Sequence, residues 1–208
     1  MIATKNLNEN ILEQLKTKSL VRIPASEKDY FSIAYKIPFK VEYHDSEIIT
    51  MGLTSYWHEL LVTNIIILLN KIFNENLEIN ILGSNSGVQI PKFEGGYYMP
   101  DVLILNTEPI FKQNSTSIIT NPHIVIEVLS PATSDFDTTE KLPEYKHIES
   151  LQQIIFISQK KINVSVYTRQ GTSNIWLNQD FDQETDEILV DGLSVSVKDI
   201  YKKIKFVK

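Results

Sequence analysis

The chain has 208 residues, 42% of them hydrophobic, which favours one compact domain with a substantial core. It contains no cysteine, and this excludes disulfide frameworks, thiolate metal sites and cysteine nucleophiles. The formal net charge of −6 argues against strong non-specific binding to nucleic acid, because such binding depends on lysine and arginine displacing counterions from phosphates.

Signals for membrane insertion or export are absent from the sequence. No stretch approaches the ~18 consecutive apolar residues of a membrane-spanning helix. The first residues, MIATKNLNENILEQLK, lack the apolar core of a signal peptide. We therefore expect a soluble cytoplasmic protein with no membrane partner. Any metal ion must be held by oxygen or imidazole, which favours magnesium, manganese or calcium.

The N-terminal segment predicts a short helix. Residues 8–18 carry Ile11, Leu12 and Leu15 at helical spacing, which is typical of an amphipathic helix. We expect this helix to belong to an N-terminal extension of residues 1–25, followed by a single domain.

A hairpin and a long helix are expected next. Between residues 39 and 51, apolar and polar residues alternate around the turn-forming residues 44–46, which predicts a β-hairpin. From residue 55 to residue 76, apolar residues recur every three or four positions. This spacing predicts a long helix with Ser55 as its N-cap.

The rest of the chain reads as short strands with few helices. A segment without periodicity at residues 107–122 predicts a loop with a helical turn, and residues 197–203 predict a final helix. Residues 26–208 should therefore form one mixed α/β domain. The predicted strands, bounded by glycine, proline, asparagine or serine, are Glu78–Leu82, Gly87–Ile90, Val102–Leu105, Ile124–Leu129, Ile154–Ile157, Asn163–Thr168 and Ser173–Leu177.

Two groups of lysines are candidates for local basic patches despite the acidic net charge. A solvated surface is the favoured alternative for the C-terminal group. The groups are Lys198, Lys202, Lys203, Lys205 and Lys208 at the C-terminus, and Lys141, Lys146, Lys160 and Lys161 before it.

Two carboxylates stand in apolar surroundings. Asp101 follows Pro100 at the start of VLIL, and Glu127 lies inside IVIEVL, a run apolar enough to be buried on both faces. An ionised carboxylate in such a strand costs several kcal/mol unless it is paired, hydrogen-bonded or bound to a cation. Glu127 therefore needs a compensating partner.

A divalent cation is one such partner. Magnesium takes oxygen ligands and is typically held by one or two carboxylates. Adjacent strands lie ~4.8 Å apart, so Asp101 and Glu127 can share an ion if their strands pair in register. The alternatives are an ordinary strand-opening aspartate at position 101 and a buried salt bridge to lysine or arginine at position 127.

The order of these residues resembles a known group of nucleases. Pro100-Asp101, an acidic residue in a buried strand and then a lysine resemble the PD-(D/E)xK phosphodiesterase superfamily. Within it, IVIEVLSPAT followed by Asp137, Lys141 and Tyr145 in DTTEKLPEY is similar to the Uma-type branch of restriction-endonuclease-like proteins, whose strand ends in EVLSPST.

The resemblance covers about residues 26–200. VEYHDSEIITM resembles the branch's YELIDGELVEM hairpin, His58 falls where the branch carries histidine, and SLQQIIFIS takes the place of GVPEYWIVD. The resemblance implies a restriction-endonuclease-like core, in which helices flank a central mixed β-sheet, with an N-terminal helix and β-hairpin.

One departure concerns the lysine. Leu129 occupies the usual lysine position of the superfamily, two residues after Glu127, and the resemblance to the branch implies that Lys141 from the following helix replaces it. Asp137 is a candidate cap for that helix, which would put Tyr145 on the same face as Lys141. Pro143 favours a later start of the helix, because proline fits a first turn better than an interior.

The resemblance also implies roles. Asp101, Glu127 and the backbone carbonyl of Val128 would hold a magnesium or manganese ion, which would polarise the phosphate and activate a water molecule. Lys141 would orient or deprotonate that water, or neutralise charge in the transition state. Glu42 would bind a second ion or a metal-bound water, with an exposed hairpin carboxylate as the alternative.

Other candidate contacts are aromatic or imidazole side chains. His58 is either a hydrogen-bonded core histidine or a contact to phosphate or metal-bound water. In the glycine-containing segment EGGYYMPD we expect a mobile loop from which Tyr97 and Tyr98 reach the substrate. His123 and His147, like His44, are expected to be structural or solvated.

The leading functional hypothesis is a magnesium-dependent endonuclease that hydrolyses DNA, with a homodimer as a reasonable form for cutting both strands. A non-catalytic nucleic-acid-binding or regulatory module that keeps the nuclease fold is the first alternative, motivated by the net charge and the displaced lysine. The second alternative is that both acids form structural ion pairs only.

Overall fold

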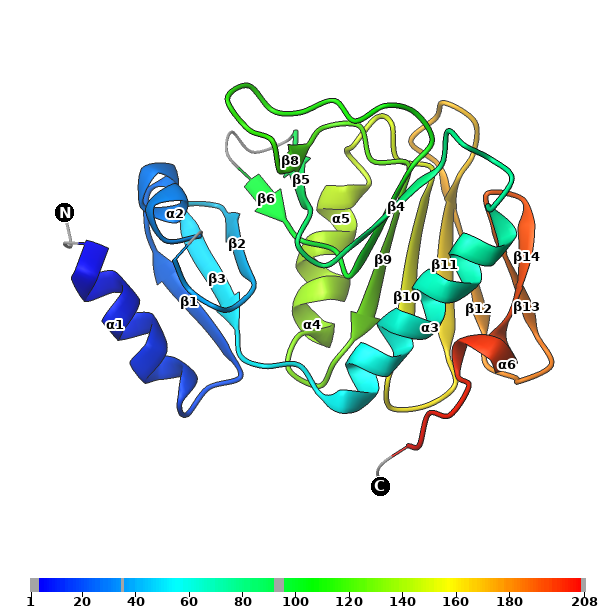
Figure 1. The fold of residues 1–208 in the computed structure, drawn as a ribbon, viewed down its shortest axis with the longest axis horizontal. Helices are drawn as coiled ribbons and strands as arrows, with labels where there is room; N and C mark the ends of the chain where they lie inside the picture. Colours follow the sequence, from blue (N-terminus) through cyan, green and yellow to red (C-terminus); the bar gives the residue numbers. More distant parts are fainter. Residues whose placement is uncertain (1–3, 35, 92–95, 207–208) are drawn as a thin grey trace.

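The computed structural model describes residues 4–34, 36–91 and 96–206, and it has a mixed α/β fold built around two large β-sheets (Figure 1). Short helices alternate with the strands, apart from one long helix, α3. The helical segments are α1 (Thr4–Leu15), α2 (Glu27–Ala34), α3 (Tyr56–Ile72), α4 (Ser134–Phe136), the π-helical η1 (Asp137–Lys141), α5 (Leu142–Tyr145) and α6 (Val197–Ile200).

The first sheet has the strand order β1-β3-β2-β6-β5-β8. It contains the predicted hairpin, whose turn residues Asp45 and Ser46 have φ angles of 48° and 61°. Two residues with positive φ match the twist of paired strands, so the hairpin prediction is confirmed. The strands are β1 (Leu20–Pro24), β2 (Val41–His44), β3 (Glu47–Met51), β5 (Gly87–Ile90), β6 (Gly96–Tyr98) and β8 (Ile118–Ile119).

The second sheet has the order β12-β11-β10-β9-β7-β4. Its β9–β10 pair is parallel and its other pairs are antiparallel, so the sheet is mixed. The strands are β4 (Asn80–Gly83), β7 (Val102–Leu105), β9 (Ile124–Leu129), β10 (Gln153–Ser158), β11 (Val164–Arg169) and β12 (Trp176–Phe181), with a separate hairpin of β13 (Glu187–Val190) and β14 (Leu193–Ser196).

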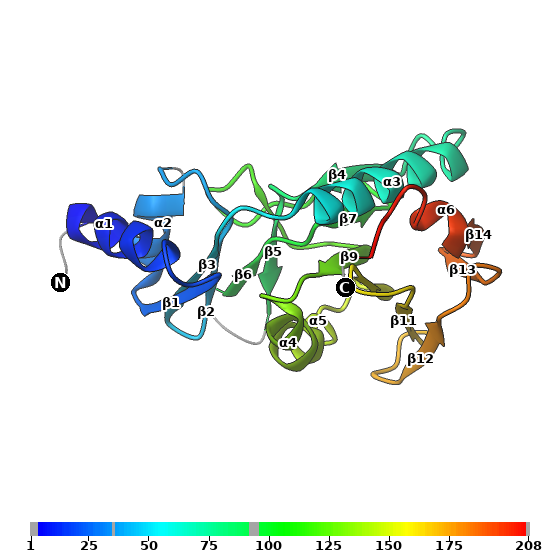
Figure 2. The same ribbon diagram turned by 90° about the horizontal axis from the view of Figure 1, so that it is seen from below.

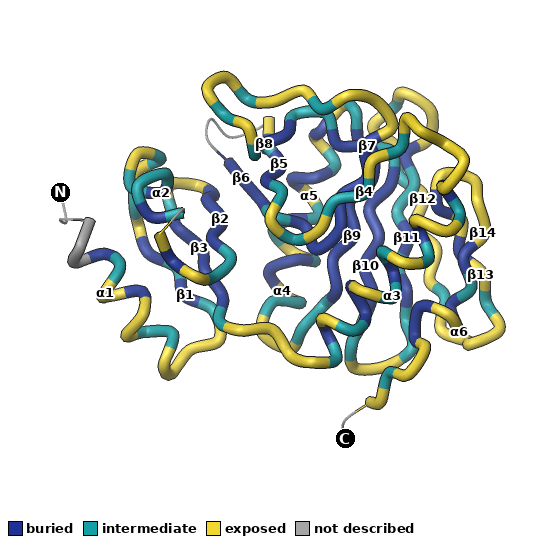
Figure 3. The backbone as a smooth tube through the Cα atoms, viewed as in Figure 1, coloured by how far each residue is buried: buried dark blue, intermediate teal, exposed yellow. Residues whose placement is uncertain are grey.

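Helices cover both faces of the second sheet. Figure 2 shows α3 and α6 on one face and α4 and α5 on the other. The central strands β9 and β10 are buried along almost their whole length (Figure 3). The expected architecture, a central mixed sheet flanked by helices with an N-terminal helix and β-hairpin, is therefore confirmed.

Alternation along β9 decides where its acidic residue points. Ile126 and Val128 belong to the apolar cluster under α3, whereas Val125 belongs to the cluster on the opposite face. Successive side chains of a strand point to opposite faces. Glu127 therefore points to the face that carries α4, η1 and α5.

The long helix begins as the sequence predicts. The Ser55 side chain accepts a hydrogen bond from the backbone N–H of His58 at 3.1 Å, so the N-cap prediction is confirmed. Leu61, Ile65 and Leu69 of α3 are buried against the second sheet. The helix ends at Ile72, four residues before the predicted end.

Several element boundaries differ from the predictions. The strand expected at residues 173–177 is β12, which begins only at Trp176 because a turn at Gly171, with a φ of 62°, precedes it. The final helix expected at residues 197–203 ends at Ile200. The segment expected to be a loop with a helical turn, residues 107–122, contains β8 and no assigned helix among its residues, all of which are described.

The N-terminal segment packs against the predicted domain. Strand β1 pairs with β3, and Leu7 and Ile11 of α1 lie in one buried cluster with Val41 and Tyr43 of β2. The boundary at residue 25 stays a prediction. Residues on the two sides of this boundary pair in one sheet and share one buried cluster.

The helical region after β9 begins earlier than expected. Helical structure starts at Ser134, so Asp137 is not the N-cap, and the later start expected from Pro143 is wrong. The hydroxyl groups of Thr138 and Thr139 donate to the carbonyls of Ser134 and Asp135 at 2.7 and 2.6 Å. Such bonds compete with regular helical pairing, and a π-helical turn just before a proline accommodates the missing N–H.

None of the helices formed by the described residues combines the length and apolar character that crossing a membrane requires.

Candidate active site

A cavity of about 360 Å³ opens beside the N-terminus of α3, where the two sheets meet. Its walls come from the segment between β3 and α3, from the loop after β9 and from η1. The charged or titratable residues that line it are Lys40, His58, Asp101, Glu127, Asp137 and Lys141. The cavity therefore gathers residues from distant parts of the chain.

Strand pairing brings the two predicted acids together. Strands β7 and β9 are antiparallel with Val102 opposite Ile126, so continuing the register by one residue places Asp101 opposite Glu127. The condition set for a shared ion, that the two strands pair in register, is therefore met. The Asp101 carboxylate Oδ2 accepts the N–H of Val128 at 2.8 Å, which ties Asp101 to β9 just beyond the last paired residues.

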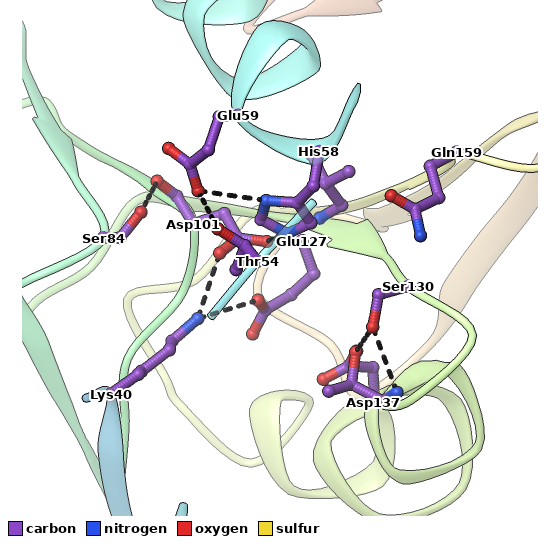
Figure 4. A network of polar contacts seen from close by, with 12 residues as sticks. Lys40, Thr54, His58, Glu59, Ser84, Asp101, Glu127, Ser130, Asp137 and Gln159 are labelled. Atoms are coloured by element: carbon purple, nitrogen blue, oxygen red, sulfur yellow. Dashed lines mark hydrogen bonds and ion pairs between the residues drawn. The ribbon is translucent and has the colours of Figure 1, made fainter. Parts of the chain in front are cut away.

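Asp101 is buried within a charged network. Its Oδ1 lies 3.0 Å from the Lys40 Nζ, and its Oδ2 lies 3.1 Å from the His58 Nε2 (Figure 4). Burial alone would raise the pKa of the Asp101 carboxyl, but the charge of Lys40 and the hydrogen bond with His58 outweigh it and hold this pKa well below its usual range. Asp101 directly precedes β7, as expected of an ordinary strand-opening aspartate, but it is also part of an ion network.

Glu127 is compensated by two neighbours from the following helical region. Its Oε1 accepts hydrogen bonds from the Lys141 Nζ at 3.0 Å and the Tyr145 hydroxyl at 2.7 Å. The salt bridge to a lysine, one of the two open readings, is therefore present. Burial raises the pKa of Glu127 despite the opposing charges of Lys141 and Lys40. The shared contact also confirms that Lys141 and Tyr145 lie on one helix face.

Lys141 is enclosed by acids and aromatic rings. Its Nζ lies 2.9 Å from Glu42 Oε1, 3.0 Å from Glu127 Oε1 and 3.1 Å from Asp137 Oδ1. The side chain is 1% exposed. Burial lowers the pKa of Lys141, but the charges of Asp137 and the two glutamates raise it by more than burial lowers it. This pKa therefore lies well above its ordinary value.

Glu42 is fully buried, so the exposed-hairpin alternative is wrong. Strand β2 lies between β3 and β6, which covers it from both sides. The Glu42 Oε1 also accepts the N–H of Met99 at 2.8 Å, while no hydrogen bond from a described residue reaches its Oε2. Glu42 does not line the cavity, and its firm contact is with Lys141.

His58 is buried and lines the cavity, so it has features of both readings offered for it. Burial lowers the pKa of His58, but the hydrogen bond and charge of Asp101 outweigh this effect and raise it above its ordinary value. The contact with Asp101 makes His58 a support for that carboxylate.

The structure adds Lys40 and Asp137 to the predicted site. Lys40 precedes β2, two positions before Glu42, and residues two apart share a strand face. This spacing from Glu42 was the feature of the sequence from which Lys40 could have been predicted. Asp137 lies four residues before Lys141 and pairs with it, a spacing that commonly brings opposite charges together on a helix.

The expectation that Tyr97 and Tyr98 contact substrate is wrong. Both lie in β6 and both side chains are fully buried. The Tyr98 ring packs 5.4 Å from the Lys141 Nζ, and the Tyr97 hydroxyl donates to Glu27. Of the segment expected to form the mobile loop, residues 94 and 95 lie outside the described residues.

The remaining histidines stay outside the cavity. His123 is buried, with its Nε2 3.0 Å from Asp191, and His147 is exposed. His44 is buried against Tyr98 at the end of β2, not in a turn.

The structure removes one lysine from the predicted basic clusters. Lys141 is buried and cannot belong to a surface patch, and the Lys146 Nζ lies 4.9 Å from the Tyr167 ring centroid. In the C-terminal group, Lys208 lies outside the described residues. The other four, Lys198, Lys202, Lys203 and Lys205, are exposed, as a solvated surface requires.

The cavity has features that fit a divalent cation. Within the described ranges, no group of three or more histidine, aspartate or glutamate residues is arranged to hold a metal. The pair Asp101 and Glu127 nevertheless offers oxygen atoms, and the Lys40 ammonium ion lies beside both, 3.0 Å from Asp101 Oδ1 and 4.0 Å from Glu127 Oε2. A cation is therefore already accommodated between them. Two carboxylates are a usual protein contribution to a magnesium site.

The chain is similar to several known proteins. Residues 29–198 match the Uma2 family, described as "Putative restriction endonuclease". Two Synechocystis proteins are similar: "Uncharacterized protein sll1609", 32% identical over 149 residues (72% of this chain, 82% of that protein), and "Uncharacterized protein slr1290", 30% identical over 186 residues (87% and 93%).

A solved structure shares the fold. It is the crystal structure of "a putative nuclease belonging to DUF820" from Anabaena variabilis, with a TM-score of 0.66 and 20% sequence identity. The similarity covers 86% of this chain and 98% of that chain.

Proposed function

Because the chain belongs to the Uma2 family, described as "Putative restriction endonuclease", we propose that it is an endonuclease that hydrolyses DNA phosphodiester bonds with a magnesium or manganese ion. The observation that carries this proposal is the pair formed by Asp101 and Glu127, which face one cavity from opposing strand positions. The order of these acids along the chain matches the nuclease motif noted in the sequence.

In this proposal, Asp101, Glu127 and the backbone carbonyl of Val128 hold the metal ion. When bound, a divalent ion polarises the phosphate and lowers the pKa of a bound water molecule. Among the described residues, the ion pairs of this site link four carboxyl groups to two ammonium groups, so acidic groups outnumber basic ones. This excess of acidic groups suits a divalent cation.

The other residues of the site hold these acids in place. His58 and the Val128 N–H fix the Asp101 carboxylate, and Tyr145 and Lys141 fix that of Glu127. Fixed ligands bind a metal ion more tightly and orient it better. Glu42 acts through Lys141, whose ammonium it binds at 2.9 Å.

Lys141 supplies positive charge to the acidic cluster. The expectation that it also orients or deprotonates the attacking water stays a prediction. Its ammonium is already hydrogen-bonded to Glu127 and ion-paired with Glu42 and Asp137, which argues against that additional contact.

The proposal is tested by plasmid cleavage. Supercoiled plasmid is incubated with magnesium or manganese and with the wild type, Asp101→Ala or Glu127→Ala, and nicked and linear products are quantified. We expect cleavage by the wild type and a loss of at least 100-fold in both variants. Equal nicking by all three proteins would contradict the assignment.

A non-catalytic nucleic-acid-binding or regulatory module is the second candidate. The observations that favour it are the net charge of −6 and the displaced lysine, since Leu129 holds the usual lysine position and Lys141 is paired with three acids. Manganese binding in calorimetry, combined with no cleavage of any nucleic acid tested, would support this candidate over the enzyme.

A further inference from the structure

Two lysines from different parts of the chain lie beside the acids of the cavity. Lys141 comes from η1 and contacts Glu127 Oε1. Lys40 comes from the segment before β2 and lies beside Asp101 Oδ1 and Glu127 Oε2 (Figure 4). These two ammonium groups differ in their freedom to change partners.

Lys141 is held by three acids at once. Its Nζ donates a hydrogen bond to Glu127 Oε1 at 3.0 Å and forms ion pairs with Glu42 and Asp137 at 2.9 and 3.1 Å. The rings of Tyr98 and Phe136 lie 5.4 and 5.2 Å from it. A change of partner would leave a buried carboxylate without compensation, which is strongly destabilising.

Lys40 is held much less firmly. Its side chain is 18% exposed and lines the cavity. Among the described residues, the Lys40 Nζ makes one hydrogen bond, to Asp101, because the Glu127 oxygen at 4.0 Å is beyond hydrogen-bonding distance. The Thr50 hydroxyl donates to the Lys40 carbonyl at 2.9 Å. The backbone is therefore fixed, while the four-carbon side chain can turn within the cavity.

The ammonium of Lys40 stands where a shared cation would stand. It lies beside one oxygen of each acid, and like charges a few ångströms apart repel each other strongly in a partly buried site. A divalent ion held by Asp101 and Glu127 must therefore displace Lys40. The cavity beside it is where the phosphate of a bound substrate would lie.

We infer that Lys40 is the lysine that changes partners in this site: its ammonium lies between Asp101 and Glu127 in the absence of metal and binds an oxygen of the scissile phosphate when the metal is present, while Lys141 stays bound to its three acids. This inference rests on the proposed function. It gives the role expected of Lys141 to a residue from the segment that precedes β2.

Metal binding tests the first half without measuring activity. Manganese affinity is measured by calorimetry for the wild type, Lys40→Met, Lys40→Arg and Lys198→Met, which loses one exposed charge on α6. We expect Lys40→Met to bind manganese about tenfold more tightly, since no cation must be displaced, whereas Lys40→Arg and Lys198→Met stay close to the wild type. Thermal unfolding confirms that each variant is folded. Manganese affinity of Lys40→Met equal to or weaker than that of the wild type would overturn the inference.

Cleavage kinetics test the second half. At saturating metal, Lys40→Met should cleave DNA about 100-fold more slowly than the wild type, and Lys40→Arg should recover part of the rate, because removing one donor to developing charge typically costs roughly 10²–10³-fold. A wild-type rate in Lys40→Met, alongside an inactive Asp101→Ala, overturns the inference but leaves the nuclease function intact. If the wild type cleaves no DNA, the proposed function fails, and the inference is overturned with it because no scissile phosphate is bound.

Discussion

Replacing Lys141 with methionine should destabilise the fold strongly. The substitution keeps the volume and apolar stem of the side chain but removes the ammonium that pairs with Glu42, Glu127 and Asp137. All three acids are buried. Removing one partner of a buried ion pair typically costs about 3–5 kcal/mol, because the remaining charge has no compensation. We expect a loss in this range.

The assay is urea unfolding followed by circular dichroism, together with a thermal melt. For a chain of this size, a loss of about 3–5 kcal/mol lowers the Tm by roughly 6–20 °C, taking about 2–4 °C per kcal/mol. Lys198→Met is the matched control, because it makes the same change on the exposed surface of α6 and should alter stability by no more than about 0.5 kcal/mol. A Lys141→Met protein as stable as this control would refute the view that Lys141 is the central cation of the site.

Two further predictions concern single side chains. His58→Ala should weaken manganese binding in calorimetry by about tenfold, because the loss of a partner that orients a metal ligand costs roughly 10–100-fold; the exposed His147→Ala is its control, and equal affinities would contradict the role of His58. Burial raises the pKa of the Tyr201 hydroxyl to about 12. The neutral hydroxyl therefore contributes up to about 2.7 kcal/mol to the free energy of unfolding below pH 10, and this contribution is lost as the pH rises towards 12. Urea unfolding at pH 8 and pH 11 should show an alkaline loss about 1.4 kcal/mol larger in the wild type than in Tyr201→Phe, and the same alkaline loss in both would exclude a contribution from Tyr201.

The acids of the site could be predicted from the sequence because two separate arguments reach them. A carboxylate inside IVIEVL needs a partner, and the order of Asp101, Glu127 and a later lysine matches a known motif. The motif also led to Lys141. The motif does not predict how many acids Lys141 contacts, because Glu42 contacts it from the first sheet.

Lys40 escaped prediction because its role depends on contacts far apart in the sequence. A lysine before a hairpin is usually solvated, and only the packing of the first sheet against β7 and β9 brings this one to Asp101. The prediction for Tyr97 and Tyr98 was wrong because it, too, depended on contacts distant in the sequence. Their neighbouring glycines suggest a loop, but pairing with β5 and β2 makes this segment a buried strand.

The ion pairs that form the site also join the two sheets. Lys40 and Glu42 belong to the first sheet or its edge, and they meet Asp101 of the second sheet and Lys141 of η1. Outside the cavity, Arg22 of β1 bonds Glu140 of η1 at 2.6 Å, which adds a third link of the same kind. The packing of the first sheet against the second therefore brings Lys40 to Asp101 and Glu42 to Lys141, whereas Lys141 reaches Glu127 from η1, which follows β9 in the chain. The network of charges around Asp101 and Glu127 is complete only when the two sheets are packed together.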